Sequence, residues 1–226
     1  MLYRKIRSYI DAHLRSNEDK ILLIEGARQI GKSYIIRDVG TELYDNYVEI
    51  NFVEDDAGDK IFRNVRTTEE FYLNLSMVAG FKLDKYENTL VFIDEIQHYP
   101  QFLTMLKFLR QEHRYRFICS GSLLGIALKK TVSVPVGSII PKKMYQLDFE
   151  EFLIANDFGE DAIVHLRKSF EQKQPLAPEV HDKVLSLFKR YLLVGGMPDA
   201  VNEYLNSHNI VKVREAQESI RELYGV

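Results

Sequence analysis

The sequence has few of the features that mark secreted, metal-binding or membrane-spanning proteins. Its 226 residues include a single cysteine, Cys119, no tryptophan and six prolines. One cysteine excludes an internal disulfide and a cysteine-based metal site, which fits a reducing compartment. No apolar run is long enough to cross a membrane, and residues 1–14 carry charges throughout, unlike a signal peptide. We therefore expect a cytoplasmic protein with no membrane partner.

The chain also lacks a large excess of charge of either sign. It has 30 basic and 33 acidic residues, for a formal net charge of −3. This balance gives no general attraction to nucleic acid or to an anionic membrane. Lys129-Lys130 and Lys142-Lys143 bracket Thr131–Pro141, which has the composition of a loop. Such a loop could touch nucleic-acid phosphates, but a solvated loop explains four lysines without interleaved aromatic residues better.

A glycine-containing segment follows the apolar residues 21–24 and carries the main chemical information. It matches every fixed position of the phosphate-binding loop G-x-x-x-x-G-K-[ST]. Glycines let backbone N–H groups approach phosphate oxygens, and the helix after the loop directs its positive end at the same anion. Lys32 would reach the β- and γ-phosphates, and the Ser33 hydroxyl would hold Mg²⁺. The predicted nucleotide-binding residues are Gly26, Ala27, Arg28, Gln29, Ile30, Gly31, Lys32, Ser33 and Tyr34.

Two acidic residues, Asp94 and Glu95, follow another apolar run at residues 90–93. A carboxylate at the carboxyl end of a buried parallel strand lies where open α/β sheets bind ligands, so Asp94 could hold the Mg²⁺ shell. Glu95 could then orient a water for in-line attack on the γ-phosphate. Alone, such a pair is more often the solvated start of a helix. Together with the loop, it predicts an ATPase in which Glu95 and Lys32 are catalytic.

Small hydroxyl residues at the end of residues 116–120 offer a further contact to the γ-phosphate. Ser120 is the first candidate for a catalytic role and Ser122 the second, although Ser-Gly-Ser is also an ordinary turn. Gln97 could bind the attacking water, or it could be a plain polar residue. Arg28 lies inside the loop and could contact the nucleotide, a neighbouring subunit or an acidic partner.

An arginine supplied by the same chain or a neighbour often completes such sites. Arg110, Arg114 and Arg116 cluster around residues 116–120, but arginines are common on any solvated helix face. His98 and His113 show no metal-ligand spacing. Mg²⁺ is therefore the only metal that the sequence implies.

The alternation of apolar strands and amphipathic helices predicts an α/β fold, namely a three-layer αβα P-loop NTPase core with a mainly parallel sheet. We expect the core to span residues 1–148, with an N-terminal helix over residues 1–16, and a small helical subdomain, resembling a lid or a winged helix, to span 149–226. The sheet is predicted from residues 21–25, 47–52, 90–93, 116–120 and 144–147. Helices are predicted over residues 32–39, 67–78, 102–112, 149–156, 162–172, 180–193, 198–204 and 212–224.

Five segments in this order resemble a family of prokaryotic AAA-like ATPases, related to the additional-strand, catalytic-glutamate group that includes AAA+ and STAND-type ATPases. The resemblance covers residues 21–204, and its Asp-Glu-Ile-Gln and Asp-Phe-Glu-Glu-Phe motifs are more specific than the phosphate loop. The segments are Gly26-Ala27-Arg28-Gln29-Ile30-Gly31-Lys32-Ser33, Phe92-Ile93-Asp94-Glu95-Ile96-Gln97, Cys119-Ser120-Gly121-Ser122, Leu147-Asp148-Phe149-Glu150-Glu151-Phe152 and Gly195-Gly196-Met197-Pro198.

The resemblance implies a longer protein. Family members usually continue into a C-terminal domain similar to restriction endonucleases, so we expect this chain to be truncated before such a domain. Many members have Gly-Arg where this chain has Gly137-Ser138, so a role for that arginine does not carry over. The resemblance also implies adenine, and no guanine-reading Asn/Thr-Lys-x-Asp segment occurs.

The leading functional hypothesis is an ATPase domain that binds and hydrolyses Mg·ATP and acts as a motor or switch. The alternative is a nucleotide-gated interaction scaffold with little intrinsic hydrolysis, which a partner protein or a homo-oligomer would complete. A small-molecule or nucleotide kinase uses the same loop but has no need of Asp94 and Glu95 in this arrangement.

Overall fold

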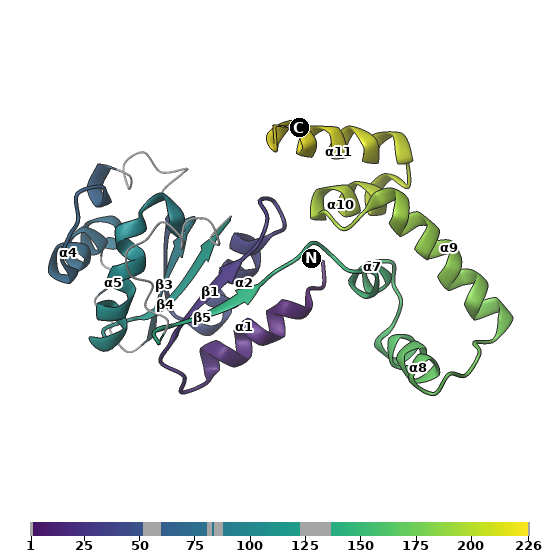
Figure 1. Ribbon diagram of the computed structural model, residues 1–226, viewed down its shortest axis with the longest axis horizontal. Coiled ribbons are helices and arrows are strands. Elements are labelled where there is room, and N and C mark those ends of the chain that lie inside the picture. Colours follow the sequence, from purple (N-terminus) through teal and green to yellow (C-terminus); the bar gives the residue numbers. More distant parts are fainter. Residues whose placement is uncertain (1, 52–59, 81–82, 84–87, 123–136, 226) are drawn as a thin grey trace. The chain divides into compact units, whose positions relative to one another are not determined.

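The computed structural model describes residues 2–51, 60–80, 83, 88–122 and 137–225 (Figure 1). The chain divides into two compact units. One comprises Ile6–Met144, and the other comprises Met1–Lys5 together with Tyr145–Val226. Among the described residues, no helix is long and apolar enough to cross a membrane.

The first unit is built on a five-stranded parallel sheet with the strand order β2-β3-β4-β1-β5. Helices flank this sheet (Figure 1), and more helices follow it in the chain. The predicted α/β class with a parallel sheet and a helical C-terminal part is therefore confirmed. The strands are β1 (Ile21–Glu25), β2 (Asn46–Asn51), β3 (Thr89–Asp94), β4 (Arg116–Gly121) and β5 (Ile139–Lys143). The helices of this part are α1 (Lys5–Arg15), α2 (Lys32–Leu43), α4 (Thr68–Ala79), the 3₁₀ turn η3 (Ile96–His98) and α5 (Pro100–Gln111).

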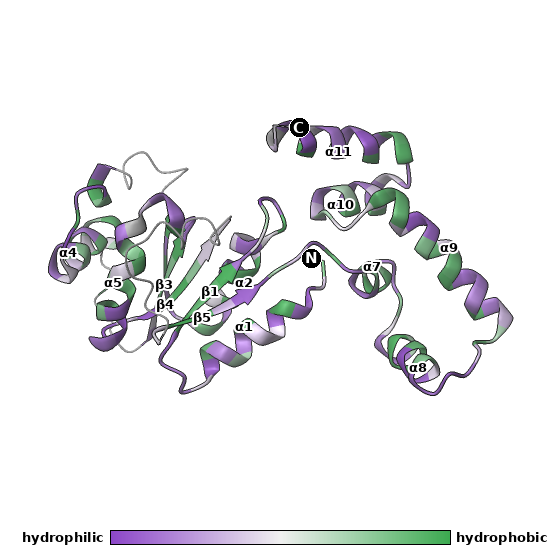
Figure 2. Cartoon of the chain, viewed as in Figure 1, coloured by the Kyte–Doolittle hydropathy of each residue, from purple (hydrophilic) through white to green (hydrophobic). Residues whose placement is uncertain are grey.

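The fifth strand corrects a sequence-based prediction. We expected a strand at residues 144–147 and a loop up to Pro141, but β5 spans Ile139–Lys143. Among the described strands it pairs with β1 alone, which makes it an edge strand of this sheet. Proline and lysine are tolerated at an edge, and lysine there discourages pairing with other chains. Figure 2 shows hydrophilic residues within β5. Phe52, Lys129, Lys130 and residues 131–136, which also entered the predictions, lie outside the described residues.

The centre of the sheet is apolar because its strands are covered on both faces. The first four residues of β1 and all six of β3 are buried, and uniformly apolar runs are typical of such strands. On one side, the ring of Phe71 in α4 packs 5.5 Å from that of Phe62 and 5.6 Å from that of Phe102 in α5. The apolar core therefore stabilises the sheet. Polar side chains that can bind ligands are left to the two ends of the sheet, where strands meet loops.

The second unit is helical, and residues near the N-terminus of the chain pack against the start of its first helix, α7. Asp148 and Glu151 form a capping box at the start of α7, each side chain accepting from the backbone N–H of the other residue. The Glu151 carboxylate also accepts from the backbone N–H of Lys5 at 2.7 Å and lies 3.4 Å from the buried Arg4 guanidinium. Residues 2–5 thus belong with this unit. Its helices are α7 (Phe149–Ala155), α8 (Glu160–Glu171), α9 (Pro178–Val194), α10 (Pro198–Ser207) and α11 (Ile210–Leu223).

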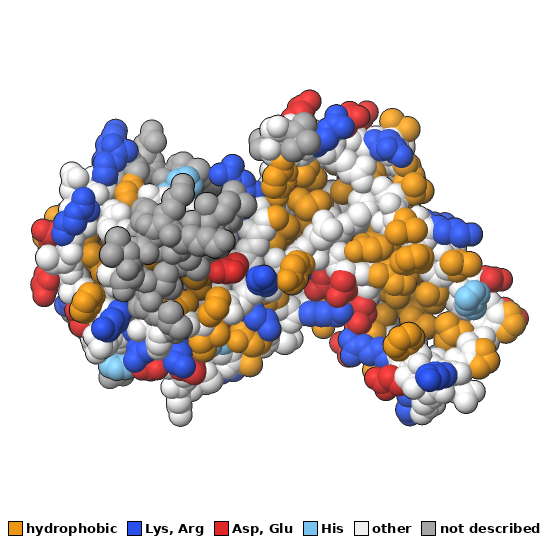
Figure 3. Space-filling model, viewed as in Figure 1, with side chains coloured by type: hydrophobic (Ala, Val, Ile, Leu, Met, Phe, Trp, Pro, Cys, Tyr) orange, Lys and Arg blue, Asp and Glu red, His pale blue; other side chains and the backbone are white. Residues whose placement is uncertain are grey.

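A close backbone approach explains the Gly-Gly-Met-Pro segment between α9 and α10. A Cβ atom on Gly196 would lie 2.1 Å from the Leu147 carbonyl oxygen. The Leu147 N–H donates to the Gly196 carbonyl at 2.7 Å. Only glycine fits there, which supports the prediction that this segment is architectural. Figure 3 shows apolar side chains gathered on the surface of this unit; on α9 the exposed ones include Leu185, Phe188 and Leu192.

Candidate functional site

The loop between β1 and α2 is shaped by residues with positive φ angles. Gly31, which precedes α2, has φ +89°, and Gln29 has φ +59°. A Cβ on Gly26 would lie 2.5 Å from the Met144 carbonyl oxygen, so the loop passes too close to the backbone for a side chain. The predicted glycine positions are thus explained by backbone geometry. The loop ends at the N-terminus of a 12-residue helix, where unpaired N–H groups favour an anion.

Lys32 lies beneath this loop. Its side chain is 4% exposed, and its Nζ donates to the carbonyl oxygens of Gly26 at 3.1 Å and Ala27 at 2.7 Å. Burial lowers the pKa of Lys32, although the charges of Glu95 and Asp94 oppose this effect. The ammonium is held at the centre of the loop by carbonyl groups that a more strongly charged acceptor, such as a phosphate, can replace.

The Asp94 carboxylate accepts hydrogen bonds from residues of α2, β2 and β4. Its Oδ2 accepts from Ser33 Oγ at 2.6 Å and from Asn51 Nδ2 at 3.4 Å. Its Oδ1 accepts from Ser120 Oγ and from the Glu95 N–H, the latter at 3.0 Å. The carboxylate is 2% exposed. The structure therefore brings together the predicted metal residues Ser33 and Asp94 and places Ser120 against the carboxylate of Asp94.

The donor set around Asp94 fits a hard cation such as Mg²⁺. A hydroxyl and a carboxylate oxygen meet at 2.6 Å, and oxygen ligands are what Mg²⁺ prefers. In the described part of the chain, no group of three histidine, cysteine or acidic residues gathers to hold a metal. Beside phosphates, Mg²⁺ commonly uses one or two protein ligands, with water and phosphate oxygens supplying the rest.

Glu95 lies directly after β3 in a left-handed conformation, with φ +47°. Its Oε2 accepts from Ser122 Oγ at 2.8 Å, from the Ser122 N–H at 3.2 Å and from Gln97 Nε2. Its Oε1 lies 3.9 Å from Lys32 Nζ. Burial would raise the pKa of Glu95, but the hydrogen bonds from Gln97 and Ser122 and the charge of Lys32 hold it below its usual value. Glu95 is therefore an ionised carboxylate at neutral pH.

The two serines predicted as alternatives have different partners. Ser120 is fully buried and contacts Asp94, whereas Ser122 is 2% exposed and contacts Glu95 and, at 3.2 Å, Gln97. The hydroxyl beside the predicted water-positioning carboxylate is thus that of Ser122. Sequence reasoning did not single out Asn51, which lies opposite Asp94 in the register of β2 and β3. Only the pairing of the strands shows this neighbour.

A cavity of about 360 Å³ opens beside these groups. Its lining includes several of the predicted nucleotide-binding residues together with Asn51 and His98. Tyr34 is 58% exposed, and Ile30 is buried at 1% exposure and does not line the cavity. The predicted residues in the lining are Arg28, Gln29, Gly31, Lys32, Ser33, Tyr34, Asp94 and Glu95.

The three arginines considered as candidates to complete the site lie elsewhere. Arg116 is the first residue of β4, and Arg110 and Arg114 flank the end of α5. Because β4 is parallel to β1, its first residue lies at the opposite end of the sheet from the loop that follows β1. The structure does not bring these arginines to the site in the same chain. Cys119 is fully buried in the core cluster, as expected for a packing role.

Comparisons with known proteins agree with this geometry. The profile of the family described as AAA domain matches residues 18–153, more than half of the chain. No curated protein matches the sequence. Among solved structures, the Walker-type ATPase PABY2304 of Pyrococcus abyssi superposes with a TM-score of 0.57 at 16% identity, covering 98% of this chain and 72% of that one.

Two further structures share the fold. PCH-2 of C. elegans has a TM-score of 0.51 at 15% identity, covering 92% of this chain and 65% of that one. The Hsp104–ADP complex of S. cerevisiae has a TM-score of 0.51 at 15% identity, covering 97% and 32%. This chain therefore spans less than two thirds of either protein. The phosphate loop, the carboxylates after β3, the parallel sheet and the matched profile lead to one conclusion: the chain belongs to the AAA domain family of P-loop ATPases.

Proposed function

We propose that the chain binds Mg·ATP at the loop between β1 and α2 and hydrolyses it with Glu95 as the water-positioning carboxylate. The observation that carries this proposal is the convergence of Lys32, Ser33, Asp94 and Glu95 beside one cavity. A kinase needs the same loop but not an ionised carboxylate directly after the strand that holds Asp94. The arrangement therefore favours water as the acceptor.

Each side chain has a distinct task in this proposal. The Lys32 ammonium exchanges the Gly26 and Ala27 carbonyls for phosphate oxygens, which are stronger acceptors because they are charged. Ser33 and Asp94 would hold Mg²⁺, which would neutralise charge that develops on the β- and γ-oxygens. Ser120 and Asn51 orient the Asp94 carboxylate through their hydrogen bonds.

Glu95 accepts a hydrogen bond from the attacking water and so aligns its oxygen with the γ-phosphorus. As the water oxygen bonds to phosphorus, the bond from phosphorus to the bridging oxygen breaks, ADP leaves and the water proton passes to the carboxylate or to solvent. The low pKa of Glu95 keeps it in the accepting, ionised form. Ser122 and Gln97 occupy Oε2, so Oε1, which faces Lys32, is the oxygen nearer to the bound phosphates.

The hydrogen bonds on Glu95 also favour one alternative. Three donors on Oε2 hold the carboxylate firmly. If the carboxylate held in this way does not reorient toward the attacking water when ATP binds, turnover is slow, and the chain acts as a nucleotide-gated scaffold. Exposed apolar residues on α9 support a partner protein or a homo-oligomer as the target of such a switch. A motor would turn over ATP repeatedly, whereas a switch would change its binding to that partner with little turnover.

Phosphate release from ATP by the wild-type protein and by Glu95→Gln, with nucleotide binding measured in both, tests the proposal. We expect Mg²⁺-dependent turnover that falls by a factor of about 100 or more in the variant, while ATP binding persists. Glu69→Gln makes the same change at an exposed position of α4 and serves as the control. Equal turnover in wild type and Glu95→Gln would contradict the assignment, and binding without turnover in both would favour the scaffold.

A further inference from the structure

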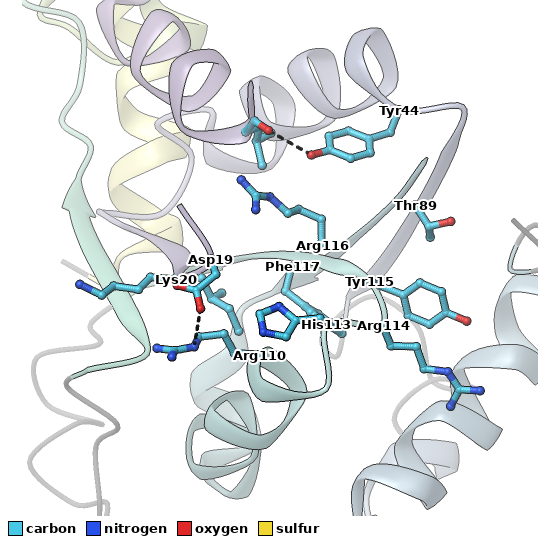
Figure 4. Close-up of a pocket in the computed structure, with 12 residues that line it drawn as sticks. Asp19, Lys20, Tyr44, Thr89, Arg110, His113, Arg114, Tyr115, Arg116 and Phe117 are labelled. Atoms are coloured by element: carbon cyan, nitrogen blue, oxygen red, sulfur yellow. Dashed lines mark hydrogen bonds and ion pairs between the residues drawn. The ribbon is translucent and has the colours of Figure 1, made fainter. Parts of the chain in front are cut away.

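A second cavity lies at the other end of the same sheet. It has a volume of about 350 Å³, close to that of the cavity beside the phosphate loop. Ile21, Thr89 and Arg116 contribute to its lining, and they are the first residues of β1, β3 and β4. These strands are neighbours in the sheet, so the cavity covers the amino ends of three adjacent strands (Figure 4). We call it the amino-edge pocket.

The lining of the amino-edge pocket is strongly basic. It contains four lysine and arginine side chains and His113, against a single acidic side chain, that of Asp19. The whole chain has a net charge of −3, so this concentration of positive charge is local. The four cationic residues are Lys20, Arg110, Arg114 and Arg116. In Figure 4, Lys20, Asp19, Arg110 and His113 group at one side of the pocket, and Arg114 and Tyr115 lie at the other.

Two arginines of the pocket are held in place by contacts that use only some of their N–H donors. Arg116 donates to the carbonyl oxygens of His13 at 3.2 Å and Ser16 at 2.8 Å. Arg110 donates to the Gly137 carbonyl at 2.7 Å, and its Nε lies 3.4 Å from Asp19. A guanidinium has five N–H donors. Carbonyl oxygens do not neutralise the charge of Arg116, whereas the Asp19 carboxylate partly offsets that of Arg110. These contacts therefore hold two guanidinium groups in fixed positions, and each group keeps N–H donors for a further acceptor.

Lys20 supplies a third cation with a different character. Within the described residues, no carboxylate pairs with its ammonium group. Lysine offers a mobile point charge, whereas arginine offers a fixed planar fork. One flexible and two anchored cations around a cavity suit a polyvalent anion, because its several oxygens can accept from all three.

Neighbouring titratable groups respond to the positive charge at this edge. Burial lowers the pKa of His13, and the charge of Arg116 lowers it further. Burial raises the pKa of the Tyr44 hydroxyl, and Arg116 opposes that rise. Both effects mean that Arg116 disfavours further positive charge and favours negative charge at this edge.

We propose that the amino-edge pocket binds a phosphate-bearing ligand through Lys20, Arg110 and Arg116. A phosphate offers the charge and the several acceptor oxygens that this donor set requires. The volume leaves room for a larger group that carries the phosphate, either a small phosphorylated molecule or one unit of a nucleic-acid backbone. This site is separate from the proposed ATP site, which lies at the carboxyl ends of the strands.

Pyrophosphate binding, measured by calorimetry, tests the proposal once the phosphate loop is disabled. The Lys32→Ala variant provides that background. Adding Lys20→Gln or Arg110→Gln should weaken pyrophosphate binding about tenfold, the effect of losing one charge-assisted contact. Adding Lys107→Gln, which removes a charge from an exposed position of α5 outside the pocket, should leave affinity unchanged. Lys20 is the decisive position because its ammonium makes no ion pair with any residue that the structure describes, so its loss should not affect folding.

Each result of the pyrophosphate experiment either supports or overturns the site. Affinity that falls in the two pocket variants and not in the Lys107→Gln control supports the site. No measurable binding to Lys32→Ala, or equal affinity in all three combined variants, overturns it. A short single-stranded oligonucleotide then identifies the source of the phosphate. Displacement of pyrophosphate by the oligonucleotide, with a steep salt dependence, indicates a nucleic-acid backbone, and failure to displace it indicates a small phosphorylated molecule.

Discussion

The two ends of the parallel sheet carry opposite chemistry on the same framework. At the carboxyl ends of the strands, Lys32 is matched by two carboxylates, those of Asp94 and Glu95, so charges of both signs meet in one cavity. At the amino ends, four cationic side chains face a single acidic one. The first arrangement is suited to binding a metal together with a phosphate and to moving a proton, whereas the second is suited only to holding an anion.

The difference follows from how strands end. At the carboxyl edge, the polar residue that ends a strand lies within hydrogen-bond distance of residues on neighbouring elements. Asp94, for example, accepts from Ser33, Asn51 and Ser120. At the amino edge, the arginines instead bond to carbonyl oxygens at the ends of helices and loops, as Arg116 does with His13 and Ser16. Changes at the two ends should therefore have separable effects, on activity at one and on stability or anion binding at the other.

The largest expected effect comes from the shared carboxylate of the carboxyl edge. Asp94→Asn removes a charge that the proposed Mg²⁺ site requires and weakens the hydrogen bonds from Ser33 and Ser120. Turnover should fall by a factor of about 100 or more, with a higher Mg²⁺ requirement, since losing a charged partner costs about 1.5–3 kcal/mol per contact. A magnesium titration of phosphate release measures this. An unchanged magnesium requirement would remove Asp94 from the metal site.

Ser122→Ala should have an intermediate effect, and it tests the electrostatics of Glu95. The wild-type pKa of Glu95 lies below its usual value, so under the proposed mechanism turnover should persist as pH falls until that lowered pKa is reached. Removing the Ser122 hydroxyl takes away a donor to the ionised form. The pKa should rise, the acid limb of the turnover profile should move to higher pH, and the maximum should fall about tenfold.

Ser186→Ala, an exposed position in α9, serves as a control for the same chemical change. An acid limb that does not move in Ser122→Ala would mean that this hydrogen bond does not tune Glu95 during turnover.

At the amino edge, Arg116→Gln should change stability and leave catalysis intact. It removes two hydrogen bonds to carbonyl groups that lie where α1 ends. We expect the free energy of unfolding to fall by about 1–3 kcal/mol, as measured by denaturant titration. ATP turnover per folded molecule should be unchanged, and the pKa of His13 should rise because a nearby positive charge is gone. Loss of turnover at full folding would show that the two ends are coupled.

The smallest effect is expected for a surface ion pair that belongs to neither end. Arg37 and Glu49 form a two-bond pair at 2.7 and 2.9 Å, but the Arg37 side chain is half exposed. Arg37→Ala should change the free energy of unfolding by less than about 1 kcal/mol and leave turnover unaltered. A larger change would mean that this pair supports β2, and through it Asn51, more than its exposure implies.

Much of the fold was predictable because its determinants are local. The run at residues 21–24 is apolar without interruption, and the glycines that follow it are explained by the φ angle at Gly31 and the contact at Gly26. The strand before Asp94 carries the same pattern. β5 escaped prediction because Pro141 and two lysines are unusual in a strand, and only its position at the edge of the sheet makes them acceptable.

Other features could not be read from the sequence because they depend on distant pairings. Asn51 becomes part of the site through the register of β2 with β3. Whether Ser120 or Ser122 contacts Glu95 depends on how β4 ends beside β3. The attachment of Arg4 to Glu151 joins residues far apart in the chain, and no periodicity indicates it. The arginines near β4 were visible in the sequence, but their place at the amino edge required the strand direction.

Equilibrium binding of ATP to Lys32→Ala, compared with wild type and with Lys107→Ala, tests the central claim most directly. If the carboxyl edge holds the nucleotide, Lys32→Ala should lose affinity by a factor of about 10–100, because the ammonium makes charged contacts to phosphate, and Lys107→Ala should bind as wild type does. Equal ATP affinity in all three proteins would contradict the assignment of the loop between β1 and α2 as the nucleotide site.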